Sequence, residues 1–101
     1  MSALRFEYHP AAIEEANHAY RWYLEQSPQA ANRFWEELVS GREKICQQPD
    51  AWTPYYHGSR CYQLRKFPYG IVYVRNDELI IAVAICHLHR KPEYCKKRMG
   101  E

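Results

Sequence analysis

The sequence lacks any hydrophobic run close to the ~20 apolar residues that a membrane-spanning helix requires. Its first seven residues also lack the apolar core of a secretion signal. Glycine is scarce, with four residues in 101, and none belongs to a loop motif that cradles phosphate groups. We therefore expect a cytoplasmic protein, and we exclude the nucleotide-binding enzymes and serine hydrolases that depend on glycine-rich turns.

The four cysteines lack the regular spacing of a disulfide framework, and in a reducing cytosol we expect them to remain thiols. Cys86, His87, His89 and Cys95 bring nitrogen and sulfur ligands close together in the sequence. They do not have the Cys-x-x-Cys spacing of a zinc site. The sequence therefore predicts neither a bound metal nor a cofactor.

The chain of 101 residues has room for one core, and we expect a single domain over residues 1–101. An apolar fraction of 47% can fill that core and argues against disorder. The net charge of +2 hides an asymmetry: residues 1–59 carry five Lys/Arg and eight Asp/Glu, whereas residues 60–101 carry nine and four. The halves are thus −3 and +5, which predicts an acidic partner for the second half.

The first half carries the signals of one strand and two helices. Residues 4–8 alternate between apolar and charged side chains, which predicts a short strand with one buried face. Pro10 marks a helix start, because proline is favoured in the first helical turn, and Ser27 with Pro28 repeats that signal. The apolar residues at helical spacing are Ile13, Ala16, Tyr20, Tyr23 and Leu24 in the first helix and Ala31, Phe34, Leu38 and Ile45 in the second.

In the second half the apolar period changes to two. Strands are predicted around residues 62–64, 69–73 and 79–85, with turn-forming sequences at residues 67–70 and 76–77. Within the last run, Leu79, Ile81, Val83 and Ile85 are expected to share one face of the sheet, with apolar residues on the other face as well. The segment between the helices and these strands, residues 49–54, is predicted to be an irregular loop anchored by Trp52.

These elements predict the α+β class. The expected order is an N-terminal strand, a two-helix hairpin, a three-stranded antiparallel meander that completes one sheet, and a short basic C-terminal turn or helix that starts near Pro92. Because the two helices are joined by a very short connection, their common apolar face should cover the sheet.

Three stretches resemble the RelE/ParE superfamily of bacterial toxins. They are the strand followed by proline at residues 6–11, the pattern Phe-Pro-Tyr-x-Ile-x-Tyr at residues 67–73, and Ala-Val-Ala at residues 82–84 leading into His-x-x-Arg-x-Pro-x-Tyr at residues 87–94. The resemblance covers nearly the whole chain and implies the fold described above. The second and third patterns are more similar to the ParE-like branch.

The resemblance implies a toxin of a type II toxin–antitoxin, or plasmid stabilisation, system. Such toxins are neutralised by a cognate antitoxin. One expected assembly is a heterotetramer of toxin and antitoxin. ParE-like members act on DNA gyrase without a known hydrolytic site, and this is the function we favour. Two alternatives stay open: a RelE-like, metal-independent endoribonuclease that cuts mRNA on the ribosome, and a non-toxic member that only binds its antitoxin.

For a ribonuclease, the positions that match the family's functional residues are Arg65, Arg90 and Tyr94, and His87 and His89 could add proton transfer. Cleaving RNA through its own 2′-hydroxyl requires a proton acceptor, a cation for the phosphate and an acid for the leaving oxygen. The chain departs from that pattern at Gly70, where ribonuclease members carry arginine, at Gln63, where a lysine is found, and at Cys95, which replaces tryptophan. Since one preorganised cation is worth about 10²–10³ in rate, the departures at Gly70 and Gln63 favour the ParE-like function. The departure at Cys95 weakens the expectation that the terminal turn works as it does elsewhere in the family.

The candidate binding residues are Lys66, Arg75, His89, Lys91 and Arg98. With the terminal residues they predict a basic surface that the antitoxin would cover. An equally plain interpretation is that Arg65, Lys66 and Arg75 line a solvated strand face that serves solubility, and the sequence does not decide between the two.

Overall fold

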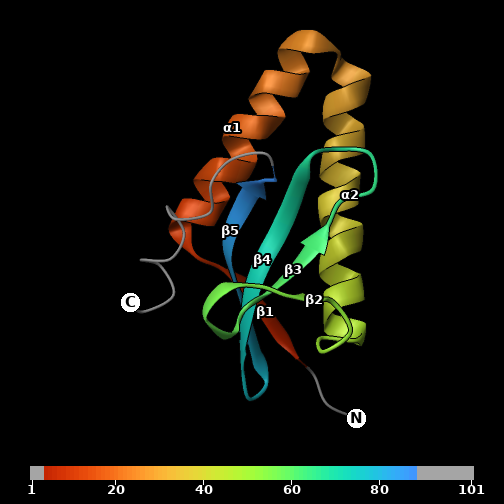
Figure 1. Cartoon of the computed structure of the whole chain (residues 1–101). Helices are drawn as coiled ribbons and strands as arrows, with labels where there is room; N and C mark the ends of the chain where they lie inside the picture. Colours follow the sequence, from red (N-terminus) through yellow and green to blue (C-terminus); the bar gives the residue numbers. More distant parts are fainter. Residues whose placement is uncertain (1–3, 89–101) are drawn as a thin grey trace.

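The structure is a computed structural model that describes residues 4–88. A hairpin of two helices packs on one face of a five-stranded sheet (Figure 1). The elements are β1 (Arg5–Tyr8), α1 (Pro10–Gln26), α2 (Pro28–Gln47), β2 (Thr53–Pro54), a 3-10 helix (Tyr56–Gly58), β3 (Arg60–Gln63), β4 (Tyr69–Asn76) and β5 (Leu79–His87). The predicted α+β class is confirmed, and the predicted C-terminal turn or helix lies outside the described residues.

The sheet has the strand order β1-β5-β4-β3-β2. Strands β3, β4 and β5 are antiparallel neighbours, as predicted, whereas β1 joins the outer side of β5 in parallel. The β4–β5 loop has the predicted two residues but consists of Asp77 and Glu78, one position later than expected. The other predicted turn, at residues 67–70, ends earlier than expected, because Tyr69 already belongs to β4.

One segment differs in kind from the prediction. Thr53 and Pro54 form a two-residue strand on the edge of β3 instead of an irregular loop. Proline is tolerated there because an edge strand does not need every N–H for pairing. The predicted anchor, Trp52, is confirmed: its ring contacts that of Tyr62 edge-on at 4.7 Å and its indole N–H donates to the Lys44 carbonyl at 3.4 Å.

The hairpin is tight because Ser27 serves both helices. Its backbone N–H donates to the Tyr23 carbonyl and closes α1 at 2.8 Å, while its Oγ accepts from the N–H of Ala30 and caps α2 at 3.4 Å. At the start of α1, Nδ1 of His9 accepts from the N–H of Ala11 at 3.0 Å. Both helix starts are therefore capped by a side chain immediately before a proline.

The inward face of α2 is the predicted one. That of α1 is predicted in part, because Ala16 is buried and Tyr20 and Tyr23 pack against the core. Small residues on α1, Ala12, Ala16 and Ala19, are the ones that face the sheet. Ile13 and Leu24, which were expected inside, remain 46% and 43% exposed. Small side chains let α1 approach the sheet closely, and Ile13 and Leu24 lie on the outer surface of the hairpin.

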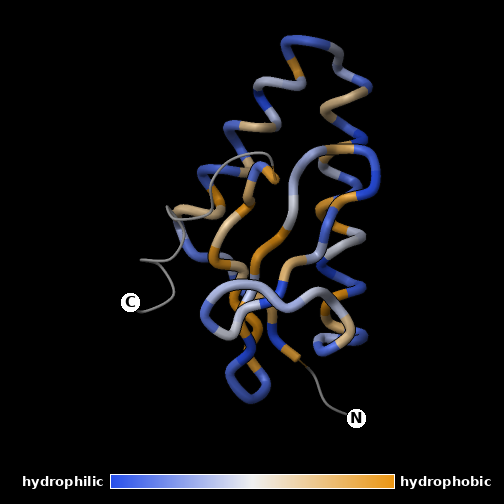
Figure 2. Tube along the Cα trace, viewed as in Figure 1, coloured by the Kyte–Doolittle hydropathy of each residue, from blue (hydrophilic) through white to orange (hydrophobic). Residues whose placement is uncertain are grey.

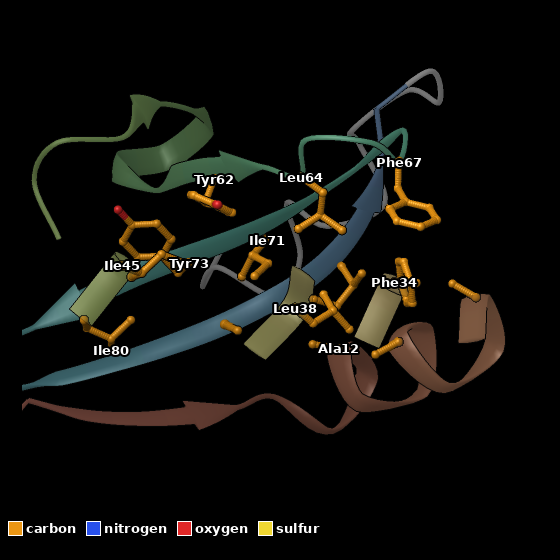
Figure 3. Close-up of a cluster of buried hydrophobic side chains, with 14 residues drawn as sticks. Ala12, Phe34, Leu38, Ile45, Tyr62, Leu64, Phe67, Ile71, Tyr73 and Ile80 are labelled. Atoms are coloured by element: carbon orange, nitrogen blue, oxygen red, sulfur yellow. The ribbon is translucent and has the colours of Figure 1, made fainter. Parts of the chain in front are cut away.

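The main core lies between the helices and the sheet (Figure 3). At the end of the hairpin's contact with the sheet, the fully buried ring of Phe34 lies 5.3–5.5 Å from the rings of Tyr23, Phe67 and Tyr69. Hydrophobic residues are concentrated along β4 and β5 (Figure 2). A smaller apolar cluster, which includes Cys61 and Cys86, covers the opposite face of the sheet.

A β-bulge in β5 inverts the alternation of its side chains between the two faces of the sheet. Val72 pairs with Ala84 and Tyr73 pairs with Ala82, so Val83 is an extra residue. Before the bulge Ala82 faces the helices, and after it Ile85 does so. The prediction that Ile81, Val83 and Ile85 share a face is therefore wrong for Ile85, because the bulge inverts the alternation. His87 follows two residues later and is carried to the helix side as well.

Tyr73 ties the core to the chain that leaves α2. Its side chain is 1% exposed, and its hydroxyl donates to the Pro49 carbonyl at 2.6 Å. Burial disfavours the phenolate and raises the pKa of Tyr73 to about 12, although the positive charge of Arg60 acts in the opposite direction. The hydroxyl therefore stays a hydrogen-bond donor at every physiological pH.

We expect the stability of the protein to fall between pH 10 and about 12, because in this window the unfolded state has released the Tyr73 proton while the folded state retains it. Tyr73→Phe should reduce the difference in bound protons between the folded and unfolded states by up to one. The plot of unfolding free energy against pH should therefore be flatter in this window. Denaturant unfolding at several pH values measures the slope. Tyr56→Phe, at an exposed position, is the matched control, and an equal flattening by both variants would contradict the assignment to Tyr73.

Candidate functional surfaces

Two of the predicted site residues lie at the same end of the sheet, where β4 begins and β5 ends. Arg65 is in the loop before β4, and His87 is the last residue of β5. The loop and the strand end are joined by a hydrogen bond from the N–H of Leu88 to the Pro68 carbonyl at 2.9 Å. The ribonuclease hypothesis therefore requires that Arg65 and His87 form one site at this end of the sheet.

The loop that carries Arg65 and Lys66 is held by a carboxylate from α2. Oε1 of Glu37 accepts from the N–H of Arg65 at 2.8 Å and from that of Lys66 at 3.4 Å. Both basic side chains remain exposed and line a hollow of about 430 Å³ together with Arg33 and Lys44. Four cations face Glu36 and Glu37 in this hollow, so its net charge is +2 and it suits an anionic group.

His87 lines a different cavity, on the side of α1. This groove of about 790 Å³ runs between α1 and the ends of β4 and β5, and it combines Glu14, Glu15, His18 and Arg21 with aromatic side chains. The His87 ring meets that of Tyr69 edge-on at 5.0 Å. Burial, and then the neighbouring Tyr69, raise the pKa of Tyr23 in the same groove, which keeps its hydroxyl protonated.

Glu15 plays the same structural part in this groove as Glu37 does in the hollow. Its Oε1 accepts the N–H of Ile85 at 2.9 Å, in the half of β5 that extends beyond the pairing with β1. The bonds that Glu15 and Glu37 make join residues 70 and 28 positions apart. The sequence analysis missed both residues, since a glutamate on the polar side of a helix carries no signal of such a distant contact.

Arg65 and His87 do not meet in one site. The hollow and the groove share no lining residue, although the loop and β4 connect them. A ribonuclease needs its proton acceptor and its phosphate-binding cation around the same phosphate. Within residues 4–88, the candidate proton acceptor His87 and the candidate cation Arg65 therefore lie in different cavities and do not form one site.

Arg75 lies far from both. It is near the other end of β4, about 20 Å from Tyr69 at ~3.3 Å per residue. Its guanidinium approaches Asp50 at 3.5 Å, and its Nε donates to the Asp77 carbonyl at 3.0 Å. The described basic residues of the chain's second half thus form two separate groups, Arg65 and Lys66 at one end of β4 and Arg60 and Arg75 at the other. The remaining predicted residues, His89, Arg90, Lys91, Tyr94 and Arg98, lie outside the described residues, as does Cys95.

The structure explains the glycine at position 70, where ribonuclease members carry arginine. A Cβ on Gly70 would lie 2.6 Å from Sγ of Cys61, 3.2 Å from Cδ2 of Leu88 and 3.3 Å from the Tyr62 carbonyl oxygen. It would point to the sheet face away from the helices, because its neighbours Tyr69 and Ile71 pack on the helix side. The space that an arginine stem would need is therefore occupied by Cys61.

The fold and these surfaces define a small α+β domain that offers binding surfaces of mixed charge. Its fold matches a solved structure titled "Chromosomal ParDE TA system from P. aeruginosa", with a TM-score of 0.73 over 85% of this chain and 97% of that chain, at 19% identity. The family model described as "ParE toxin of type II toxin-antitoxin system, parDE" matches residues 6–92. The chain belongs to this ParE toxin family.

Curated relatives agree with that assignment. Proteins named "Toxin ParE2" from two strains of Mycobacterium tuberculosis, CDC 1551 / Oshkosh and H37Rv, are each 27% identical over 89 residues, which cover 87% of this chain and 85% of theirs. The predicted RelE/ParE membership and the preference for the ParE-like branch are both confirmed. Membership of a toxin–antitoxin system also implies an antitoxin partner. Within residues 4–88, no helix has the length and apolar character needed to cross a membrane.

Proposed function

We propose that this ParE-family toxin acts by binding DNA gyrase in the cytoplasm and not by cutting RNA. The observation that supports this proposal is the packing at position 70, where Sγ of Cys61 lies 2.6 Å from the place of a Cβ and so opposes the side chain that would carry the ribonuclease cation. The separation of Arg65 from His87 supports it independently. A cognate antitoxin would neutralise the toxin in a heterotetramer and would cover the hollow around Arg65 and Lys66, whose net positive charge suits an acidic segment.

The test is induced expression in a bacterial host without the antitoxin, following growth, DNA integrity and protein synthesis in one culture. We expect growth arrest with DNA breaks and an SOS response while translation is initially intact. Purified toxin should also inhibit supercoiling by purified gyrase. Early translation arrest with mRNA cleavage would instead establish the ribonuclease alternative, and normal growth with verified soluble toxin would establish the non-toxic one.

Three substitutions sharpen this experiment. A ribonuclease should lose toxicity with Arg65→Ala, Arg90→Ala or Tyr94→Phe, because each removes a group that acts on the phosphate or on a proton. A gyrase-binding toxin should retain toxicity with Tyr94→Phe, which removes a single hydroxyl. Circular dichroism of each purified variant separates a lost function from a lost fold.

A further inference from the structure

A third cavity lies at the end of the sheet opposite to Arg65 and His87. It is formed where the β4–β5 loop and the start of β3 lie beside the chain that leaves α2 (Figure 1). Its volume is about 480 Å³, which is typical of a site for a small molecule. Four of its lining residues are charged, and we call the cavity between them the turn pocket. These residues are Asp50, Arg60, Arg75 and Asp77.

The two arginines enter the turn pocket from adjacent strands. Arg60 on β3 pairs with Tyr73 on β4, and Arg75 follows Tyr73 by two residues. Since Tyr73 faces the helices, the side chains of both arginines lie on the same side of the sheet. Their diagonal placement puts the Cβ atoms about 7–8 Å apart. At this separation two guanidinium groups can donate to one carboxylate, and such charge-assisted bonds are among the strongest that proteins form.

Most of the N–H groups of these arginines have no acceptor in the protein. Nη1 of Arg60 donates to the Trp52 carbonyl at 2.7 Å. Nε of Arg75 donates to the Asp77 carbonyl at 3.0 Å, while its Nη1 comes only within 3.5 Å of Asp50. Neither arginine has a further partner within residues 4–88. Each guanidinium therefore keeps several donors for a ligand.

The two aspartates restrict the charge of that ligand. Asp50 is 77% exposed and makes only the long contact with Arg75, and the carboxylate of Asp77 has no partner within the described part of the chain. Two arginines and two aspartates give the turn pocket a net charge of zero. A nucleic acid or a free phosphate would be repelled by both carboxylates. A ligand that carries one charge of each sign would instead be matched by both pairs of residues.

We propose that the turn pocket binds a free α-amino acid, with its carboxylate held by the two arginines and its ammonium group held by the two aspartates. The base of the site is rigid, because Tyr73 is 1% exposed and its hydroxyl is bonded to the Pro49 carbonyl. The ligand would join β3, the β4–β5 loop and the chain after α2, and so would stabilise the folded toxin as its concentration rises. This inference goes beyond the action on gyrase and does not depend on it, because its test is direct binding.

An NMR titration of the isotope-labelled toxin with L-glutamine tests the proposal. The Nε–H signals of Arg60 and Arg75 should shift, whereas that of Arg65 in the hollow should not. Two analogues that each lack one charge are the controls: N-acetylglutamine has no ammonium group, and glutaminamide has no α-carboxylate. Each should bind about tenfold more weakly than glutamine, because each loses a charge-assisted contact. Inorganic phosphate, which lacks the positive charge, should also bind more weakly.

Four substitutions assign the contacts. Arg75→Gln and Asp77→Asn each remove one charge from the turn pocket and should weaken glutamine binding about tenfold. Asparagine tolerates the φ of 57° at position 77, so this variant should keep the loop intact. Arg65→Gln in the hollow and Glu78→Gln in the same loop are the charge-matched controls, since neither residue lines the turn pocket, and they should leave binding unchanged.

Three outcomes would each overturn the proposal. The first is binding of N-acetylglutamine or phosphate as tight as that of glutamine, because the site would then recognise an anion alone. The second is a loss of glutamine binding in the control variants as large as in the turn-pocket variants. The third is the absence of any shift in the arginine Nε–H signals when glutamine is added.

Discussion

Replacing Gly70 by arginine is expected to destabilise the protein by about 3 kcal/mol or more and to confer no ribonuclease activity. The stem would enter the space 2.6 Å from Sγ of Cys61, in a strand whose neighbours are buried. The guanidinium would emerge on the sheet face opposite the groove that contains His87. Urea unfolding followed by circular dichroism measures the stability, and an mRNA cleavage assay measures the activity.

A double-mutant cycle isolates the contact with Cys61. Gly70→Ala alone should cost about 1–3 kcal/mol, because the added methyl group overpacks a filled site. Cys61→Ala removes the sulfur, so adding Gly70→Ala to it should cost clearly less, with a coupling of about 1–2 kcal/mol between the positions. Additive losses would show that Cys61 does not exclude a side chain from position 70.

Phe34→Ala is expected to lower the free energy of unfolding by about 3–5 kcal/mol, a large part of the ~5–15 kcal/mol that stabilises a typical domain. Phe34 is fully buried and contacts three aromatic rings from α1, the loop before β4 and β4 itself. The cavity would lie where the hairpin meets the end of the sheet that carries Arg65 and His87. We therefore also expect the loop at Arg65 to become less well ordered.

The adjacent residue provides the control for this prediction. Trp35 is larger than Phe34 but 44% exposed, and its ring contact is with Tyr20 on the outer surface. Trp35→Ala should cost only about 1 kcal/mol, since little apolar area returns to water and one ring pair is lost. Guanidinium unfolding of the two variants, analysed with a common slope, compares them. Losses of equal size would contradict the packing described for the hairpin.

Several features of the fold were predictable because they depend on neighbours in the chain. The two helix starts follow from Ser27 and the prolines at positions 10 and 28, whose effects act within one turn. The antiparallel meander follows from short loops, which leave consecutive strands no other way to pair. The inward face of α2 follows from apolar residues at helical spacing.

The errors arose where a distant contact overrides the local pattern. On α1, close approach to the sheet placed the small residues Ala12 and Ala19 inside, beside the predicted Ala16, and left Ile13 and Leu24 outside although they are more hydrophobic. On β5, the extra residue Val83 inverted the alternation and carried His87 to the helix side. Neither effect has a local sequence signal, since each depends on the surface against which the element packs.

The candidate site shows the same division. Family patterns selected Arg65 and His87, but only the structure placed them in different cavities and supplied Glu37 and Glu15 to hold the adjoining backbone. The sequence by itself determined the elements, their order and the ParE-like resemblance, because propensity, capping and alternation act over a few residues. Tertiary structure decided which side chains meet, why position 70 is glycine, and which apolar residues remain outside, because packing compares surfaces that are far apart in the chain.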